Sequence, residues 1–313
     1  MMRMVAAALL VCAACGGGAA PAPTTPSPPA PTGDRATVPL LVEGNRPFVD
    51  VTFRKPDGGA RTARFLVDSG GGGFLIVEPL AKEVGLALGE TASEDGQTFA
   101  MVTSTVHASI GGLELELDPK RVLVMVGKTN MLPPVAPGHA DGLLPGHVLA
   151  HYHVVFDYPK QQFTIAKPGA LVSQGTAIAM PVGAASGFPR TELEIDGKTY
   201  GVLLDTGASF TMVSQTLLES LGQAHPEWTR QKGAVGEAAT LGGQALETMI
   251  VPKLTWGGHA LVDVGVVSQQ AGVFEKWMSS MMSAPIVGSL AGNVLKQFRV
   301  DLDYPNQKLY LTR

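Results

Sequence analysis

Cysteine, charge and long apolar runs are all scarce in this sequence of 313 residues. Its two cysteines, Cys12 and Cys15, lie at the extreme N-terminus, so we expect no disulfide within the folded part of the chain. Charged residues make up 16% of the sequence, against roughly 25% in typical soluble domains, and no run of Lys or Arg stands out. Nucleic-acid binding therefore has little electrostatic support.

The apolar run near the N-terminus is too short to cross a membrane, which takes about 20 residues. It follows Arg3 and ends in small residues, and this pattern predicts a signal peptide over residues 1–15. The ending "CAAC" resembles the lipobox of bacterial lipoproteins, although Cys12 stands where that family prefers Leu. The resemblance implies lipidation of Cys15 and an exported, membrane-anchored protein facing the periplasm or the cell exterior. An ordinary cleavage site near Ala14 is the alternative.

Residues 16–35 are rich in Pro, Ala and Thr and show no apolar periodicity. Such a segment cannot bury a core, so we expect an extended tether, with the folded part beginning near Ala36. The whole sequence contains 38 Gly and 23 Pro, which favours many turns and an all-β class over a helical one.

Two stretches of the chain repeat one pattern. The segment "FLVDSGGGGFLIVEPLAKEVGL" begins at Phe65, and "VLLDTGASFTMVSQTLLESLG" begins at Val202. Each has an apolar strand, then Asp, a hydroxyl residue and Gly, then small residues, a second apolar strand and a short helical pattern. Asp68 matches Asp205, so the repeat supplies two equivalent carboxylates.

A second pair of segments repeats more closely. "DGLLPGHVLAHYHVVFDYPKQQFTI" (141–165) aligns without gaps to "VGSLAGNVLKQFRVDLDYPNQKLYL" (287–311), with about ten of twenty-five positions identical. The two pairs occur in the same order, which indicates an internal duplication. Alternating apolar residues predict hairpins around "KPDGG" and around Asp196-Gly197. Short helices are expected at about 78–84, 146–152, 215–221 and 292–298.

On these motifs the sequence resembles the pepsin- and retropepsin-like aspartic proteases. Both halves carry the Asp-Ser/Thr-Gly turn, the later apolar-Gly strand and the closing hairpin, as in single-chain pepsins. The resemblance implies an all-β fold with two lobes, a cleft between them and a few short helices. The N-terminal lobe is expected at 36–168 with Asp68, and the C-terminal lobe at 169–313 with Asp205.

Paired carboxylates have a specific chemical use. Two of them about 3 Å apart cannot both ionise readily, so they share one proton. The charged group can take a proton from a water held between the two, while the protonated group donates to a peptide carbonyl. The resemblance implies these catalytic roles for Asp68 and Asp205, with no metal and no cofactor.

The residues after each aspartate support this interpretation. Gly70 and Gly207 allow the two backbones to approach closely. The resemblance implies that the hydroxyls of Ser69 and Thr206 bond backbone across the pseudo-twofold axis. Gly71 and Ala208 cannot supply the hydroxyl that bonds the outer carboxylate oxygen in acid-active relatives, so we expect a mildly acidic optimum, roughly pH 5–6.

These inferences lead to a monomeric aspartic endopeptidase acting on peptide or protein substrates. The glycine run at 70–73 leaves an alternative open, a catalytically weak or inactive lipoprotein of the same fold that binds peptides or another ligand. The candidate lids are residues 90–104, with Phe99 or Met101 over the cleft, and the glycine-rich residues 231–243.

Two rival sites are less well supported. His147 and His151 have helical spacing and His153 follows, but the duplicated segment has no His at these positions, so we expect a solvated helix face and no metal. Asp157 and Asp303 match each other, but each precedes a turn, where Asp commonly caps the backbone.

Overall fold

The computed structural model of the chain describes residues 33–94, 96–127, 132–232 and 247–313. The predicted signal peptide, Cys15 and the predicted tether up to residue 32 lie outside the described residues. The first strand begins at Arg35, immediately before Ala36, where the sequence predicted the start of the folded part.

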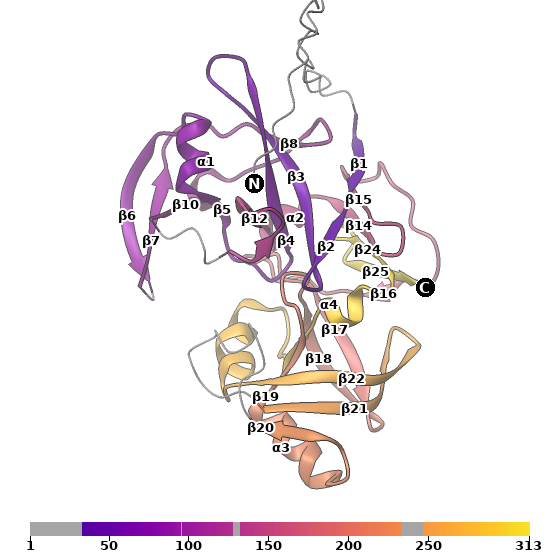
Figure 1. Cartoon of the computed structure of the whole chain (residues 1–313). Coiled ribbons are helices and arrows are strands. Elements are labelled where there is room, and N and C mark those ends of the chain that lie inside the picture. Colours follow the sequence, from indigo (N-terminus) through magenta and orange to yellow (C-terminus); the bar gives the residue numbers. More distant parts are fainter. Residues whose placement is uncertain (1–32, 95, 128–131, 233–246) are drawn as a thin grey trace, which may run out of the picture.

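The first lobe is built on a ten-stranded sheet (Figure 1). Its strands β3 and β4 form the predicted hairpin, and Val51, Phe53 and Phe65 on them are fully buried while Asp50 is exposed. This alternation gives the sheet one core-facing side. In spatial order the strands are β6 (Leu88–Glu94), β7 (Gln97–Val102), β10 (Val122–Val126), β5 (Phe74–Val77), β13 (Gly142–Pro145), β4 (Ala60–Asp68), β3 (Arg46–Arg54), β8 (Ala108–Ile110) and β9 (Leu113–Glu114), with β2 (Leu41–Glu43) beside β3.

The second lobe is built on a seven-stranded sheet. Its first hairpin turns at Asp196 and Gly197, whose φ angles of 52° and 70° are those of a tight hairpin turn. In spatial order the strands are β17 (Arg190–Ile195), β18 (Lys198–Leu204), β23 (Gly288–Leu290), β19 (Thr211–Ser214), β22 (His259–Gln269), β21 (Glu247–Trp256) and β20 (Arg230–Lys232).

A third sheet of six strands joins the two halves of the chain. Its central pair is β14 and β24, one from each copy of the duplicated segment, running antiparallel with Val155 opposite Asp301. In spatial order the strands are β1 (Arg35–Pro39), β15 (Gln162–Ala166), β14 (His153–Asp157), β24 (Arg299–Asp303), β25 (Lys308–Thr312) and β16 (Ile178–Ala179). A small hairpin of β11 (Pro134–Val135) and β12 (Gly138–His139) stands apart.

The helices are few and short, as predicted. The longest of the described α-helices, α3, begins where the Ser214 hydroxyl accepts a hydrogen bond from Leu217 N–H, and it buries its leucines against the second sheet. The α-helices are α1 (Glu78–Glu83), α2 (Gly146–Leu149), α3 (Gln215–Ala224) and α4 (Gly292–Leu295). Helical turns of other types are η1 (Pro119–Arg121), η3 (Val273–Met278) and η4 (Ser279–Met281).

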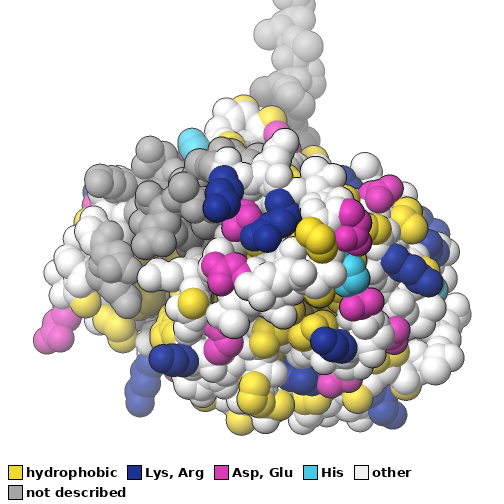
Figure 2. All heavy atoms as spheres, turned by 90° about the horizontal axis from the view of Figure 1, so that it is seen from below, with side chains coloured by type: hydrophobic (Ala, Val, Ile, Leu, Met, Phe, Trp, Pro, Cys, Tyr) yellow, Lys and Arg dark blue, Asp and Glu magenta, His cyan; other side chains and the backbone are white. Residues whose placement is uncertain are grey.

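The predicted fold class is confirmed, because the described chain is mostly β-strand and divides into two lobes (Figure 1). In the described part of the chain, no helix is long and apolar enough to span a membrane. At the second-lobe end of the molecule, Lys and Arg side chains are scattered among Asp and Glu (Figure 2).

Candidate active site

Both predicted carboxylates stand where a central strand of each lobe ends. Asp68 is the last residue of β4, and Asp205 directly follows β18. The apolar-Gly strands β13 and β23 run parallel to these two strands, with Pro145 opposite Asp68 and Leu290 opposite Leu204. The motifs recognised in the sequence are therefore neighbours in each sheet, and they bring the two aspartates to the junction of the lobes.

The hydroxyl residues after the aspartates lock the two turns together. Ser69 Oγ donates to Leu204 O at 2.6 Å and accepts from Thr206 N–H at 3.0 Å. In return, Thr206 Oγ1 donates to Val67 O at 2.7 Å and accepts from Ser69 N–H at 3.0 Å. Both hydroxyl residues are fully buried. These are the hydrogen bonds that the resemblance implied, and they fix each turn by means of the other lobe.

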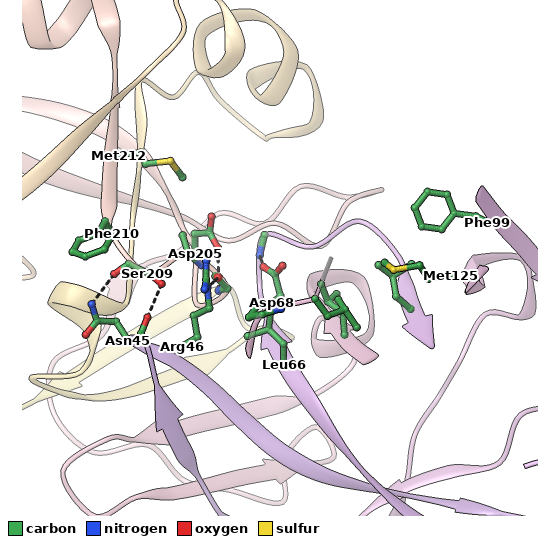
Figure 3. A pocket seen from close by; sticks show the side chains of 18 residues that line it. Asn45, Arg46, Leu66, Asp68, Phe99, Met125, Asp205, Ser209, Phe210 and Met212 are labelled. Atoms are coloured by element: carbon green, nitrogen blue, oxygen red, sulfur yellow. Dashed lines mark hydrogen bonds between the residues drawn. The ribbon is translucent and has the colours of Figure 1, made fainter. Parts of the chain in front are cut away.

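The two glycines allow the carboxyl groups to meet. A Cβ added at Gly207 would lie 2.2 Å from Asp68 Cγ, and a Cβ added at Gly70 would lie 3.0 Å from Asp205 Cγ. Each carboxyl group therefore rests over the glycine of the opposite turn, in space that a side chain would fill. Figure 3 shows Asp68 and Asp205 side by side in the middle of the site.

Burial raises the pKa of Asp68 well above its usual value, and the charge of Asp205 raises it further. The Gly70 N–H, which donates to Asp68 Oδ1 at 2.9 Å, and the nearby Arg46 guanidinium act in the lowering direction. A hydrogen bond between the two carboxyl groups raises the pKa of Asp68 and lowers the pKa of Asp205, so the titration belongs to the pair.

Burial likewise raises the pKa of Asp205, but two backbone donors oppose it. Gly207 N–H and Ala208 N–H both donate to Asp205 Oδ1 at 3.1 Å, and Arg46 also acts in the lowering direction. Because donors to a carboxylate favour its charged form, the surroundings of Asp205 hold a negative charge better than those of Asp68.

The two carboxylates open into a cleft of about 710 Å³. Its first-lobe side is apolar, and its second-lobe side mixes polar and apolar groups (Figure 3). The first side is lined by Leu66, Leu75, Phe99, Met125, Leu132 and Leu143, and the second by Ser209, Phe210 and Met212 together with Asn45 and Arg46, which reach it from the first lobe. A volume of this size suits a ligand with several side chains.

One of the two candidate lids is described. Residues 90–94 and 96–104 include most of β6 and all of β7, and Phe99 reaches the cleft wall while Met101 is exposed and is not among the cleft residues. Of the other candidate, residues 233–243 lie outside the described residues.

The predicted solvated face for the three histidines is wrong for two of them. His147 is buried in α2 with neither ring nitrogen hydrogen-bonded, and burial lowers its pKa to about 4. His153 lies in β14 and pairs through Nε2 with the buried Asp301 at 2.6 Å. Only His151 is exposed. The helix ends at Leu149, so the helical spacing of His147 and His151 does not create a shared face.

The second aspartate pair caps turns, as predicted. Asp157 Oδ1 accepts from Lys160 N–H at 3.1 Å, and Asp303 Oδ1 accepts from Asn306 N–H at 3.3 Å. Across the described residues, no group of His, Cys, Asp and Glu is arranged to hold a metal ion.

The sequence reasoning overlooked Arg46. It begins β3 in the first lobe, lines the cleft beside both aspartates, and donates from Nε to Gly207 O at 2.9 Å. A signal was available, because "NRPF" at 45–48 and "GFPR" at 187–190 each lead into the first hairpin of a lobe. Arg46 and Phe188 occupy matching positions in the two copies. A charged residue in one copy where the other has an aromatic ring indicates a role beyond packing.

Comparison with known families agrees with this site. A model of the family described as aspartyl protease matches residues 191–289, which include Asp205, Thr206 and Gly207. No curated protein matches the chain. The match covers less than half of the chain and supports a relationship to aspartic peptidases. Asp68 lies outside it and is connected to it by the duplication.

Proposed function

We propose that the protein is an aspartic endopeptidase that hydrolyses peptide bonds with a water molecule activated between Asp68 and Asp205. One observation carries this proposal: the carboxyl groups of Asp68 and Asp205, one from each copy of the duplication, lie next to each other and line an open cleft. The match to the aspartyl protease family over residues 191–289 supports the same chemical class.

The reaction uses the one proton that the pair shares. The ionised carboxylate takes a proton from water as the water oxygen bonds to the peptide carbonyl carbon. The protonated carboxyl group donates its hydrogen to the carbonyl oxygen, which gives a neutral tetrahedral diol. The carboxyl group that is now protonated gives its proton to the peptide nitrogen, while the other carboxylate takes a proton from a diol hydroxyl; the C–N bond breaks, a carboxylic acid and an amine form, and the pair again holds one proton. The stronger donor set at Asp205 favours the charge there before substrate binds.

The cleft favours an extended peptide whose side chain on the first-lobe side is large and apolar. Leu75, Phe99 and Leu143 line that side, and burying a Leu- or Phe-sized side chain there contributes about 1.5–3 kcal/mol.

Anchoring through Cys15, outside the described residues, would confine this activity to substrates near a membrane surface.

The test is cleavage of an unfolded protein substrate by the full chain and by Asp205→Asn. We expect Asp205→Asn to lower the cleavage rate by at least about 10²–10⁴-fold, because the variant lacks one partner of the general acid–base pair. Asp57→Asn is the matched control, since Asp57 lies in the exposed β3–β4 turn and should leave the rate unchanged.

A second measurement separates catalysis from mere binding. A peptide mimic with a hydroxyl at the tetrahedral carbon should bind and inhibit, because it resembles the transition state. Cleavage that persists in Asp205→Asn would overturn the proposal. Tight binding of peptides by a wild-type chain that cleaves none of them would favour the binding-protein alternative.

A further inference from the structure

The turn before β3 reaches from the first lobe onto the aspartate turn of the second lobe. Asn45 Nδ2 donates to Ser209 O at 3.1 Å, and Ser209 Oγ donates back to Gly44 O at 2.5 Å. Next to them, Arg46 Nε donates to Gly207 O at 2.9 Å. Three consecutive residues of one lobe therefore hold the segment that carries Asp205.

The same docking occurs on the other side of the pseudo-twofold axis, without a charge. Asn45 and Gly187 both have positive φ, 64° and 73°, and each packs against the glycine that begins a short helix, Gly292 and Gly146 respectively. The residue after Gly187 is Phe188, which is 3% exposed and packs with Leu203, Phe274 and Ile286. An apolar residue therefore satisfies the packing at this position, and packing alone does not require Arg46.

We propose that Arg46 is a positioning residue for the reaction, which fixes the Gly207 turn and stabilises the singly ionised form of the Asp68–Asp205 pair. This inference rests on the proposed peptidase function. Figure 3 shows Arg46 beside Asp205 in the cleft. A cation here has an electrostatic role because the dielectric around half-buried groups is lower than that of water.

Two phenols lie close to the pair, Tyr158 near Asp205 and Tyr304 near Asp68. Burial raises the pKa of Tyr158 and of Tyr304, and the charges of Asp205 and Asp68 respectively raise these values further, so both phenols are neutral at working pH. Arg46 is then the group of opposite charge that acts on both carboxyls. It opposes the burial that raises the pKa of each one.

The sign of the effect follows directly. Without the cation, the pair would hold its second proton up to a higher pH, and a doubly protonated pair has no base to activate water. Removing the charge should therefore move the acidic limb of the pH–rate profile to higher pH. An opposite charge at close range shifts a carboxyl pKa by about 1–3 units, and partial exposure of Arg46 places the expected shift near the lower end.

The experiment compares Arg46→Gln and Arg46→Lys in the full chain, using kcat/KM against pH. Gln retains an N–H donor for Gly207 O and loses the charge, so the acidic limb of the Arg46→Gln profile should move to higher pH by roughly one unit. Lys retains the charge and loses the Nε geometry, so its limb should stay near that of wild type while kcat falls. Arg54→Gln, on the exposed far end of β3, is the matched control and should leave the profile unchanged.

A titration of the carboxyl groups by ¹³C NMR provides a readout that needs no turnover. The acidic titration step of the pair should move upward in Arg46→Gln and stay in place in Arg54→Gln. An unmoved step in a folded Arg46→Gln overturns the inference whether or not the chain cleaves peptides. A moved step in a chain without cleavage supports the inference about Arg46 and counts against the proposed function alone.

Discussion

The turn at Asp68 and the turn at Asp205 share a backbone scaffold and differ in the donors that they offer to their carboxylates. In the first turn, Gly71 N–H is bonded to the main-chain oxygen of Asp68 at 3.1 Å. In the second, the equivalent N–H of Ala208 is bonded to the Asp205 carboxylate at 3.1 Å. The Asp205 carboxylate therefore accepts two backbone hydrogen bonds, where the Asp68 carboxylate accepts one.

The comparison separates two kinds of constraint. The hydroxyls of Ser69 and Thr206 form equivalent hydrogen bonds, because each one bonds the backbone of the other turn. Each copy therefore requires a hydroxyl at this position. The donors around the carboxylates, and the pair Arg46 and Phe188, need not match. Unequal surroundings are useful in a pair that must hold one proton, because they favour one site for the charge.

The largest expected effect tests the shared scaffold. Ser69→Ala removes the donor to Leu204 O and the acceptor for Thr206 N–H, and Thr206→Val does the equivalent damage in the other turn. Each variant leaves two buried backbone groups unsatisfied at about 1–3 kcal/mol apiece, so the free energy of unfolding should fall by roughly 2–6 kcal/mol. Urea unfolding of both variants measures this loss of stability. Strongly unequal losses would show that the two hydroxyls do not contribute equally to the contact between the turns.

The second prediction tests how tightly each carboxyl group packs against the glycine of the opposite turn. Gly207→Ala places a Cβ 2.2 Å from Asp68 Cγ, whereas Gly70→Ala places one 3.0 Å from Asp205 Cγ. We expect Gly207→Ala to lower kcat by about 10²-fold or more, because displacing a reacting group by about 1 Å has that effect, and Gly70→Ala to lower it less. Steady-state kinetics on both variants decide the order, and a reversed order would show that Asp68 is the less constrained carboxylate.

The third and smallest effect concerns stability against pH. The folded-state pKa of each carboxyl lies above its unfolded value, so the stability that the protonated pair contributes is fully present below about pH 3.9 and is lost as pH rises through the folded-state values. Asp68→Asn removes this loss. Its Tm should therefore exceed that of wild type at pH 8, by roughly 2–4 °C per kcal/mol regained.

The control for this prediction is the same pair of proteins at pH 3, where the wild-type carboxyls are already protonated. There the Tm difference between Asp68→Asn and wild type should nearly vanish. A variant that is less stable than wild type at pH 8 would show that the ionised pair stabilises the fold, contrary to the direction of both pKa shifts.

The sequence was sufficient for the duplication, the two aspartates and the turns that hold them. These features depend on local order, since an apolar strand, a carboxylate, a hydroxyl and a glycine occur at the same spacing in both halves. The hairpin at Asp196-Gly197 and helix α3 were predictable for the same reason, because turn residues and leucine spacing act within a few residues.

Only the tertiary structure decided which groups from distant segments surround these motifs. His147 and His153 were placed on a solvated helix face, but α2 ends at Leu149 and the chain buries both. His153 meets Asp301 because β14 pairs with β24, and Arg46 reaches Gly207 because one lobe docks on the other. Burial and charge pairing are properties of contacts between residues more than a hundred positions apart, and no local pattern specifies them.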